Sequence, residues 1–127
     1  MNHKAAWLLV FTLTGCAIEV PRTPSALSQA SAQSDHRIIQ LDVDTAIDVG
    51  TGYPRLLPRG TVLKHVGRIA EGEVYKPVNF TLTLEGANVH EAFLVLKDFD
   101  LVGFYLPVEG AFVLPKAKIT TKFSTRG

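Results

Sequence analysis

The stretch AFLVLKDFDLVGFYLPV, residues 92–108, decides the fold of this chain. It holds two apolar runs, 92–96 and 101–108, separated by the short segment KDFD at 97–100. Two apolar runs joined by a compact turn predict a β-hairpin. Each run is apolar on both of its faces, which is typical of strands that lie in the middle of a sheet. The hairpin is therefore predicted to form the centre of the fold.

Two details of this hairpin affect its interpretation. Gly103 interrupts the second run and predicts a β-bulge or a close approach of another backbone. Phe104 and Tyr105 fall on opposite faces of the strand, so one ring would meet solvent or a partner if only one face were buried. A helix over 87–97 is the competing interpretation of the first run, because ANVHEAFLVLK begins with helix formers. The β-branched and aromatic residues favour strands.

Alternating segments on both sides of the hairpin extend the β pattern. In FTLTLE, residues 80–85, the side chains of Phe80, Leu82 and Leu84 share one face. RIIQLDV at 37–43 and KAKITTKF at 116–123 alternate in the same way. Such alternation predicts half-buried strands, which turns rich in glycine and proline separate. The predicted fold class is mainly β, a small antiparallel sandwich or partly open barrel with one short helix as an option, in a single domain over 37–127.

The N-terminus has the three-part layout of a secretory signal. Lys4 supplies the positive charge, a run of nine residues at 5–13 supplies the apolar region, and a small residue precedes Cys16. About 20 apolar residues would be needed to span a bilayer. LTGC, residues 13–16, resembles the lipobox of bacterial lipoproteins. The resemblance implies a signal peptide over 1–15, cleavage before Cys16 and acylation of its sulfur.

The resemblance also bears on where the protein is sorted. Ala17, rather than aspartate, follows the cysteine, and this implies the outer membrane rather than the inner one. Serine, alanine, glutamine and proline dominate the residues that follow, and no apolar period persists. The sequence therefore predicts a lipidated cysteine and a flexible linker over 16–36. As a random coil, such a linker would have a root-mean-square reach of about 25 Å.

Composition excludes some partners and crosslinks. Loss of Lys4 with the signal leaves 12 of the 13 basic residues, which balance the 12 acidic ones. A chain without net charge gives no reason to expect nucleic-acid binding. Cys16 is the only cysteine, so an intramolecular disulfide is impossible. The domain must therefore be held together by its hydrophobic core.

The sequence offers no catalytic or metal-binding motif of the usual spacings. The histidines of the mature chain, at 36, 65 and 90, form no paired ligand pattern. The aspartates at 42, 44 and 48 do not fit a calcium loop, and no serine lies in a G-x-S-x-G motif. A meeting of Glu71, Glu73, Glu85 and Glu91 in space stays open, although no spacing favours it. No cofactor and no metal is predicted.

A lysine-rich face near the C-terminus is the one charge pattern in the domain. Lys116, Lys118 and Lys122 would lie on one face of the predicted strand 116–123, and no acidic residue follows Glu109. One interpretation is a contact for an anionic partner such as lipid phosphate, lipopolysaccharide or an acidic protein. The other is an edge strand whose lysines prevent pairing with a second sheet.

These features predict a non-enzymatic protein of the cell envelope. The lipid on Cys16 would hold it in the outer membrane, with its domain facing the periplasm, as a binding or structural accessory module. An envelope protein is the expected partner, and no nucleic acid is expected. The alternative is a small inhibitor or immunity protein tethered to the envelope.

Overall fold

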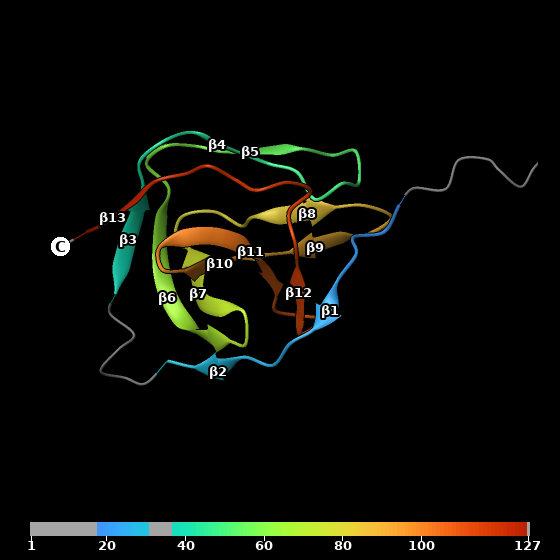
Figure 1. Cartoon of the computed structure of the whole chain (residues 1–127), viewed down its shortest axis with the longest axis horizontal. Helices are drawn as coiled ribbons and strands as arrows, with labels where there is room; N and C mark the ends of the chain where they lie inside the picture. Colours follow the sequence, from blue (N-terminus) through green and yellow to red (C-terminus); the bar gives the residue numbers. More distant parts are fainter. Residues whose placement is uncertain (1–17, 31–36, 127) are drawn as a thin grey trace, which may run out of the picture.

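The computed structural model describes residues 18–30 and 37–126, and every regular element in these ranges is a β-strand (Figure 1). The strands are β1 (Thr23–Pro24), β2 (Ser28–Gln29), β3 (Ile38–Leu41), β4 (Thr45–Ile47), β5 (Arg55–Leu57), β6 (Val62–Ile69), β7 (Gly72–Pro77), β8 (Thr83–Glu85), β9 (Val89–Glu91), β10 (Phe93–Lys97), β11 (Asp100–Leu106), β12 (Ala111–Val113) and β13 (Phe123–Thr125). The mainly β, antiparallel, sandwich-like fold predicted from the sequence is confirmed, and the barrel is not closed. The alternative helix over 87–97 is wrong, since β9 and β10 occupy that segment.

The central hairpin lies where the sequence predicts it. β10 and β11 pair antiparallel, with Leu94 opposite Phe104 and Lys97 opposite Asp100. The two residues between them, Asp98 and Phe99, both have positive φ (51° and 67°), which is the conformation of a tight hairpin turn. The Phe99 ring meets the edge of the Phe123 ring at a centroid distance of 6.3 Å. This contact helps to hold an aromatic residue in a conformation that it rarely adopts.

The prediction of a close backbone approach at Gly103 is also confirmed. The pairing of β10 with β11 changes register next to this residue, as in a β-bulge. A Cβ atom on Gly103 would lie 2.5 Å from Cζ of Phe112 and 2.5 Å from the carbonyl oxygen of Val113. Only glycine lets β12 lie this close to β11.

The main sheet runs in the order β1-β12-β11-β10-β7-β6-β3-β13, and β2 pairs with β6 beside β3. Figure 1 shows it from β13 and β3 at the left to β1 at the right, with the separate β4–β5 hairpin along the top. The larger apolar core joins one face of this sheet to the hairpins β4–β5 and β8–β9, through residues such as Phe104, Leu57 and Leu84. A smaller core on the other face includes Phe93 and Tyr105. The central strands are therefore buried on both faces, and both rings of the Phe104–Tyr105 pair are core.

The flexible linker predicted over 16–36 is wrong for residues 18–30, which we call the strap. β1 in the strap pairs with β12, and β2 pairs with β6. Val20 is only 1% exposed and belongs to the larger core, and Leu27 packs against the smaller one. Two apolar side chains seven positions apart produce no visible period, so composition alone predicts a linker. The remaining linker residues, 16–17 and 31–36, lie outside the described residues.

The predicted strand over 116–123 is also wrong in most of its length. Only Phe123 belongs to a strand, at the start of β13, which pairs with β3. The preceding residues cross the end of the fold as an irregular segment, and the Lys116 amide donates to the Asp48 carbonyl at 2.8 Å instead of to a sheet ladder. Pro115 has no amide hydrogen to donate, which disfavours sheet pairing at this point. Lys116 and Lys118 therefore do not belong to an edge strand, whereas Lys122 directly precedes the edge strand β13 and its carbonyl accepts from the Asp42 amide at 2.8 Å.

Candidate functional site

The residues predicted as functional divide into those that the structure describes and one that it does not. Cys16, the predicted lipidation site, lies outside the described residues, and the strap begins two positions later. Within the described ranges, no helix is long and apolar enough to cross a membrane. Lys116 and Lys118 are close together on the irregular segment after β12 and line one cleft of about 570 Å³ against the start of β11. Lys122 is exposed but does not line this cleft.

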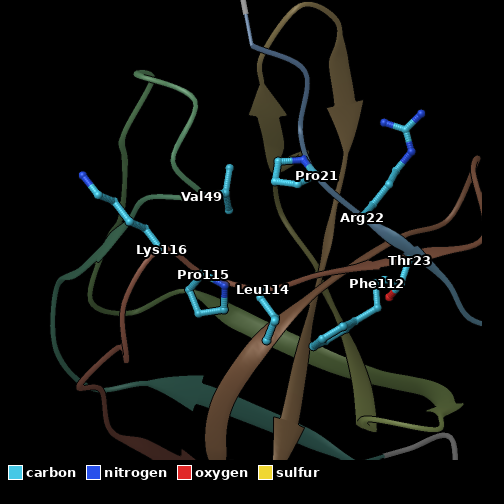
Figure 2. Close-up of a pocket in the computed structure, with 8 residues that line it drawn as sticks. All are labelled: Pro21, Arg22, Thr23, Val49, Phe112, Leu114, Pro115 and Lys116. Carbon is cyan, nitrogen blue, oxygen red and sulfur yellow. The ribbon is translucent and has the colours of Figure 1, made fainter.

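A second, apolar groove of about 380 Å³ lies between the strap and the same irregular segment (Figure 2). Figure 2 shows Pro21 and Val49 on one side of the groove and Leu114 and Pro115 on the other. The Phe112 ring and Thr23 extend it toward the β1–β12 pair, and Arg22 and Lys116 stand at its two ends. Leu114 is 67% exposed, so its side chain is accessible to a ligand in the groove. Apolar walls with Lys116 at one end suit a ligand with an apolar body and an anionic group.

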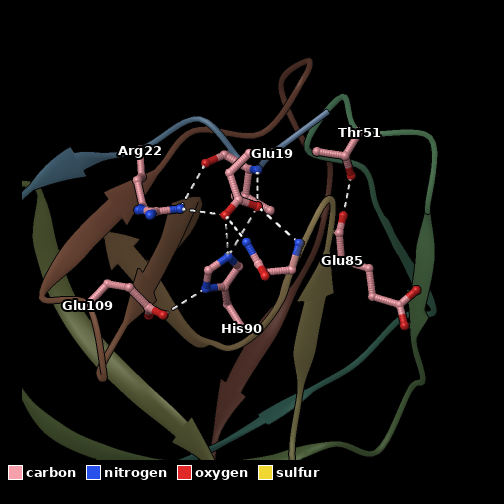
Figure 3. Close-up of polar contacts among 8 residues, drawn as sticks. Glu19, Arg22, Thr51, Glu85, His90 and Glu109 are labelled. Atoms are coloured by element: carbon pink, nitrogen blue, oxygen red, sulfur yellow. Dashed lines mark hydrogen bonds and ion pairs between the residues drawn. The ribbon is translucent and has the colours of Figure 1, made fainter. Parts of the chain in front are cut away.

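A buried histidine joins the strap to the rest of the domain (Figure 3). Nδ1 of His90 lies 2.7 Å from Oε2 of Glu109, and Nε2 lies 3.3 Å from both carboxylate oxygens of Glu19. Glu19 belongs to the strap, His90 to β9 and Glu109 to the turn between β11 and β12. When both ring nitrogens carry protons, the imidazole can donate to the two carboxylates at once. We call these three residues the His90 clamp.

Further polar groups fix the strap carboxylate. The Asn88 side-chain amide donates to Glu19 at 2.9 Å, and the Val20 amide donates to it at 2.9 Å. Arg22 approaches the same carboxylate at 3.4 Å. The hydrogen bonds from Asn88, which contribute most, from the Val20 amide and from His90 outweigh the opposing effect of burial and lower the pKa of Glu19 from 4.5 to about 2. Glu19 is therefore ionised in neutral solution and holds the strap in place as an anion.

The geometry of the clamp does not fit a metal site. The two carboxylates contact opposite edges of the His90 ring, so no single point lies close to all three donors. Over the part of the chain that the structure describes, no group of three histidine, cysteine or acidic side chains could hold a metal ion. The role that this arrangement supports is to fix the path of the strap.

A second buried histidine lies at the other end of the strap. Nε2 of His65 is 2.8 Å from Oε1 of Glu73, whose other oxygen accepts from Arg68 Nε at 2.6 Å. Burial favours a higher pKa for Glu73, but the hydrogen bonds from Arg68 and His65 outweigh it and leave the pKa lowered. The His65 ring stacks obliquely on Tyr75 at 5.2 Å, and burial raises the pKa of that tyrosine although Arg37 opposes it. Among residues 18–30 and 37–126, no hydrogen-bond partner reaches the buried Nδ1 of His65.

Neither histidine is arranged for nucleophilic catalysis. A side-chain nucleophile would need its hydroxyl or thiol within hydrogen-bond distance of the histidine, and among the described residues both rings hydrogen-bond to carboxylates alone. Of the glutamates that the sequence left open, Glu73 contacts His65, Arg68 and Arg37. Glu71 accepts instead from the Ser25 hydroxyl at 2.7 Å and so holds the strap. The four do not form a shared acidic site in the contacts that the structure records.

Sequence reasoning missed both histidine clusters. His65 and Glu73 are eight positions apart in one hairpin, so a prediction of the β6–β7 register would have placed them close together. In the clamp, His90 is 71 positions from Glu19 and 19 positions from Glu109 in the sequence. No local pattern indicates contacts over such separations.

No family model, no curated protein and no solved structure matches this chain.

Proposed function

We propose that this chain is a lipoprotein of the bacterial outer membrane, anchored through Cys16, whose β domain binds another component of the cell envelope without catalysing a reaction. The signal-like N-terminus and the LTGC motif support the anchor. The groove between the strap and the segment after β12 supports the binding role, and it is the observation on which that role depends.

The groove favours a partner of a definite chemistry. Its walls include Val49, Leu114 and Pro115, while Arg22 and Lys116 stand at its ends. Arg22 already pairs with Glu19 at 3.4 Å, so a protein segment with an apolar side chain beside an acidic residue would bury the first in the groove and pair the second with Lys116. We therefore propose an envelope protein with such a segment as the partner. Lys118 in the neighbouring cleft would add to the attraction.

Lipid labelling in growing cells tests the anchor. The wild-type chain should incorporate labelled fatty acid and fractionate with the outer membrane, whereas C16S should incorporate none. The thiol is the nucleophile that takes up the lipid, and a hydroxyl replaces it poorly. Labelling of C16S at the wild-type level would contradict the anchor.

Site-specific photo-crosslinking tests the binding role. A photoreactive residue in place of Leu114 should capture one partner in intact cells, whereas the same residue in place of Leu56 should not. Leu56 is a matched control because it is similarly exposed, at 62% against 67%, and does not line the groove. Equal capture at both positions, or none at 114, would contradict a partner in the groove. Capture of a soluble enzyme or toxin as the single partner would favour an inhibitor or immunity protein.

A further inference from the structure

The start of the strap and the tip of the β8–β9 hairpin form one end of the molecule. The Ala87 amide donates to the Ile18 carbonyl at 3.0 Å, and the Asn88 side chain holds Glu19. Gly86 allows this approach, because a Cβ atom there would lie 2.5 Å from the Ile18 carbonyl oxygen. Figure 1 shows the first strap residues and the hairpin tip together at the right of the long axis, opposite β13 at the left.

Two exposed aliphatic side chains lie on the surface of this end, and the charged side chains beside them, Glu19 and Arg22, pair with each other. Ile18 and Val89 are 61% and 62% exposed, and the residues between β8 and β9 are Gly86, Ala87 and Asn88. We call Ile18 and residues 86–89 the tip patch. Glu19, whose carboxylate is hydrogen-bonded to this tip, also contacts His90 and Arg22. Figure 3 shows the Glu85 carboxylate pointing away from the tip. The tip patch can thus approach an apolar phase without desolvating an unpaired charge.

The covalent chain limits how far this end can lie from the predicted anchor. Cys16 precedes Ile18 by two residues, and two residues of extended chain span at most about 7 Å. An acyl chain on Cys16 lies within the bilayer, so the strap must begin at the height of the lipid headgroups. A flexible linker would have freed the domain from this constraint. The strap removes that freedom, because the clamp and the contacts of the hairpin tip hold its first residues.

We propose that the tip patch rests on the bilayer that holds the Cys16 anchor, with Ile18 and Val89 inserted among the lipid headgroups. This inference depends on the lipidation proposed above. Two exposed aliphatic side chains beside an acylated residue add buried apolar area to the anchor, and they supply a second contact point that restricts rotation about it. The long axis of the domain then points away from the membrane, with β13 at the distal end. The groove lies beside strap residues 21–23 and therefore close to the membrane surface.

Depth-dependent quenching tests this orientation on the full acylated protein. Acylation leaves Cys16 without a free thiol, so Val89→Cys and Thr125→Cys can each be labelled with one environment-sensitive fluorophore. The proteins are bound to vesicles of phosphatidylethanolamine and phosphatidylglycerol whose acyl chains are brominated near the headgroup. We expect quenching of at least twofold at position 89 and none at 125, which is exposed in β13. Ala87→Cys is a second tip position in case the label at 89 perturbs folding.

Flotation of the same samples separates the two proposals. Protein that floats with the vesicles and is quenched at 89 or 87 but not at 125 supports the tip patch as the membrane contact. Protein that floats with equal fluorescence at all three positions overturns this inference and leaves the anchor standing. That result would be expected if a protein partner, rather than lipid, covers the tip. Failure of the acylated wild-type protein to float overturns the anchor and this inference together.

Discussion

The β10–β11 hairpin and the strap are stabilised in opposite ways. The hairpin contributes to both apolar cores, through Phe104 on one face and Tyr105 on the other. The strap contributes Val20 to one core and Leu27 to the other, and polar contacts such as the His90 clamp hold the rest of it. Loss of the hairpin should therefore unfold the domain, whereas the strap should be able to open while the sheet persists. The hairpin is therefore expected to determine the stability of the fold, and the strap is expected to fix where the chain enters it.

Truncation of a hairpin side chain should have the largest effect. Phe104 is fully buried in the larger core, so Phe104→Ala should lower the free energy of unfolding by about 3–5 kcal/mol through lost burial and a residual cavity. Denaturant titration of the purified domain measures the change. Val108→Ala, at an 80% exposed position just beyond β11, is the control and should stay within about 0.5 kcal/mol. Similar losses in both variants would show that the hairpin is not the centre of stability.

The hairpin could be predicted from sequence because its evidence is local. The two apolar runs and the turn between them are contiguous, and burial on both faces follows from their composition. The strap could not be predicted in the same way. Its two core side chains, Val20 and Leu27, are seven positions apart and show no strand or helix period. Its hydrogen-bond partners belong to β6, β9 and β12, whose positions depend on the complete sheet. Composition identifies a polar segment, but it does not reveal whether the folded domain offers that segment an edge to pair with.

Two glycines each allow a close backbone contact, one in the hairpin and one at the start of the strap. A Cβ atom on Gly103 would meet the Val113 carbonyl oxygen at 2.5 Å, and one on Gly86 would meet the Ile18 carbonyl oxygen at 2.5 Å. Gly103→Ala should lower the free energy of unfolding by about 1–3 kcal/mol, because the surrounding core cannot shift without strain. Gly86→Ala should cost less, because the start of the strap can move aside. Thermal denaturation of both variants measures the difference, and a larger loss for Gly86→Ala would reverse the assignment of the two regions.

Removal of the clamp histidine should free the strap and leave the sheet intact. His90→Ala removes the contacts to Glu19 and Glu109, and a hydrogen bond contributes about 1 kcal/mol. We expect hydrogen exchange at the amides of Ser25 and Ala87, which pair the strap with the domain, to become roughly five- to tenfold faster. Exchange in β10 and β11 should change little. Val89→Ala, at the neighbouring exposed position, is the control. Unchanged exchange at Ser25 and Ala87 in His90→Ala would mean that the clamp does not hold the strap.

The clamp residues could not have been recognised as a group from the sequence. His90 appeared as an isolated histidine followed by Glu91, and Glu19 lay in a segment predicted to be a linker. Both become interpretable only when the sheet brings β9 and the β11–β12 turn to the same side of the strap. The lysines show the opposite case. Alternation over 116–123 predicts a strand with three lysines on one face, but Pro115 and the Asp48 contact interrupt the ladder, and only Lys116 and Lys118 line the same cleft.

Acid should open the strap before it unfolds the hairpin. The pKa of Glu19 is lowered from 4.5 to about 2, so its contribution to strap binding is complete above about pH 4.5 and is lost as the pH falls toward 2. Exchange at the Ala87 amide, corrected for its intrinsic pH dependence, should therefore accelerate within this window. In Glu19→Gln the acceleration should be absent, and the strap should already be looser at pH 7. The pKa of Glu73 is also lowered, so Glu73→Gln serves as the control for general acid destabilisation. An acceleration that persists in Glu19→Gln would assign the effect to another group.

The smallest effect on folding is expected at the lysines, which belong to neither region. Lys118 is exposed on the irregular segment after β12, so Lys118→Ala should change the free energy of unfolding by less than about 0.5 kcal/mol. Lys116→Gln combined with Lys118→Gln should fold equally well and yet weaken photo-crosslinking from position 114, since both cations lie beside the groove or its neighbouring cleft. Added salt should weaken capture by the wild type more than capture by this double variant, because fewer charges remain to be screened. Lys122→Gln is the matched control, as Lys122 is equally basic but lines neither cavity. If Lys122→Gln reduced capture as strongly as the double variant does, the partner would be attracted by overall charge rather than by the groove.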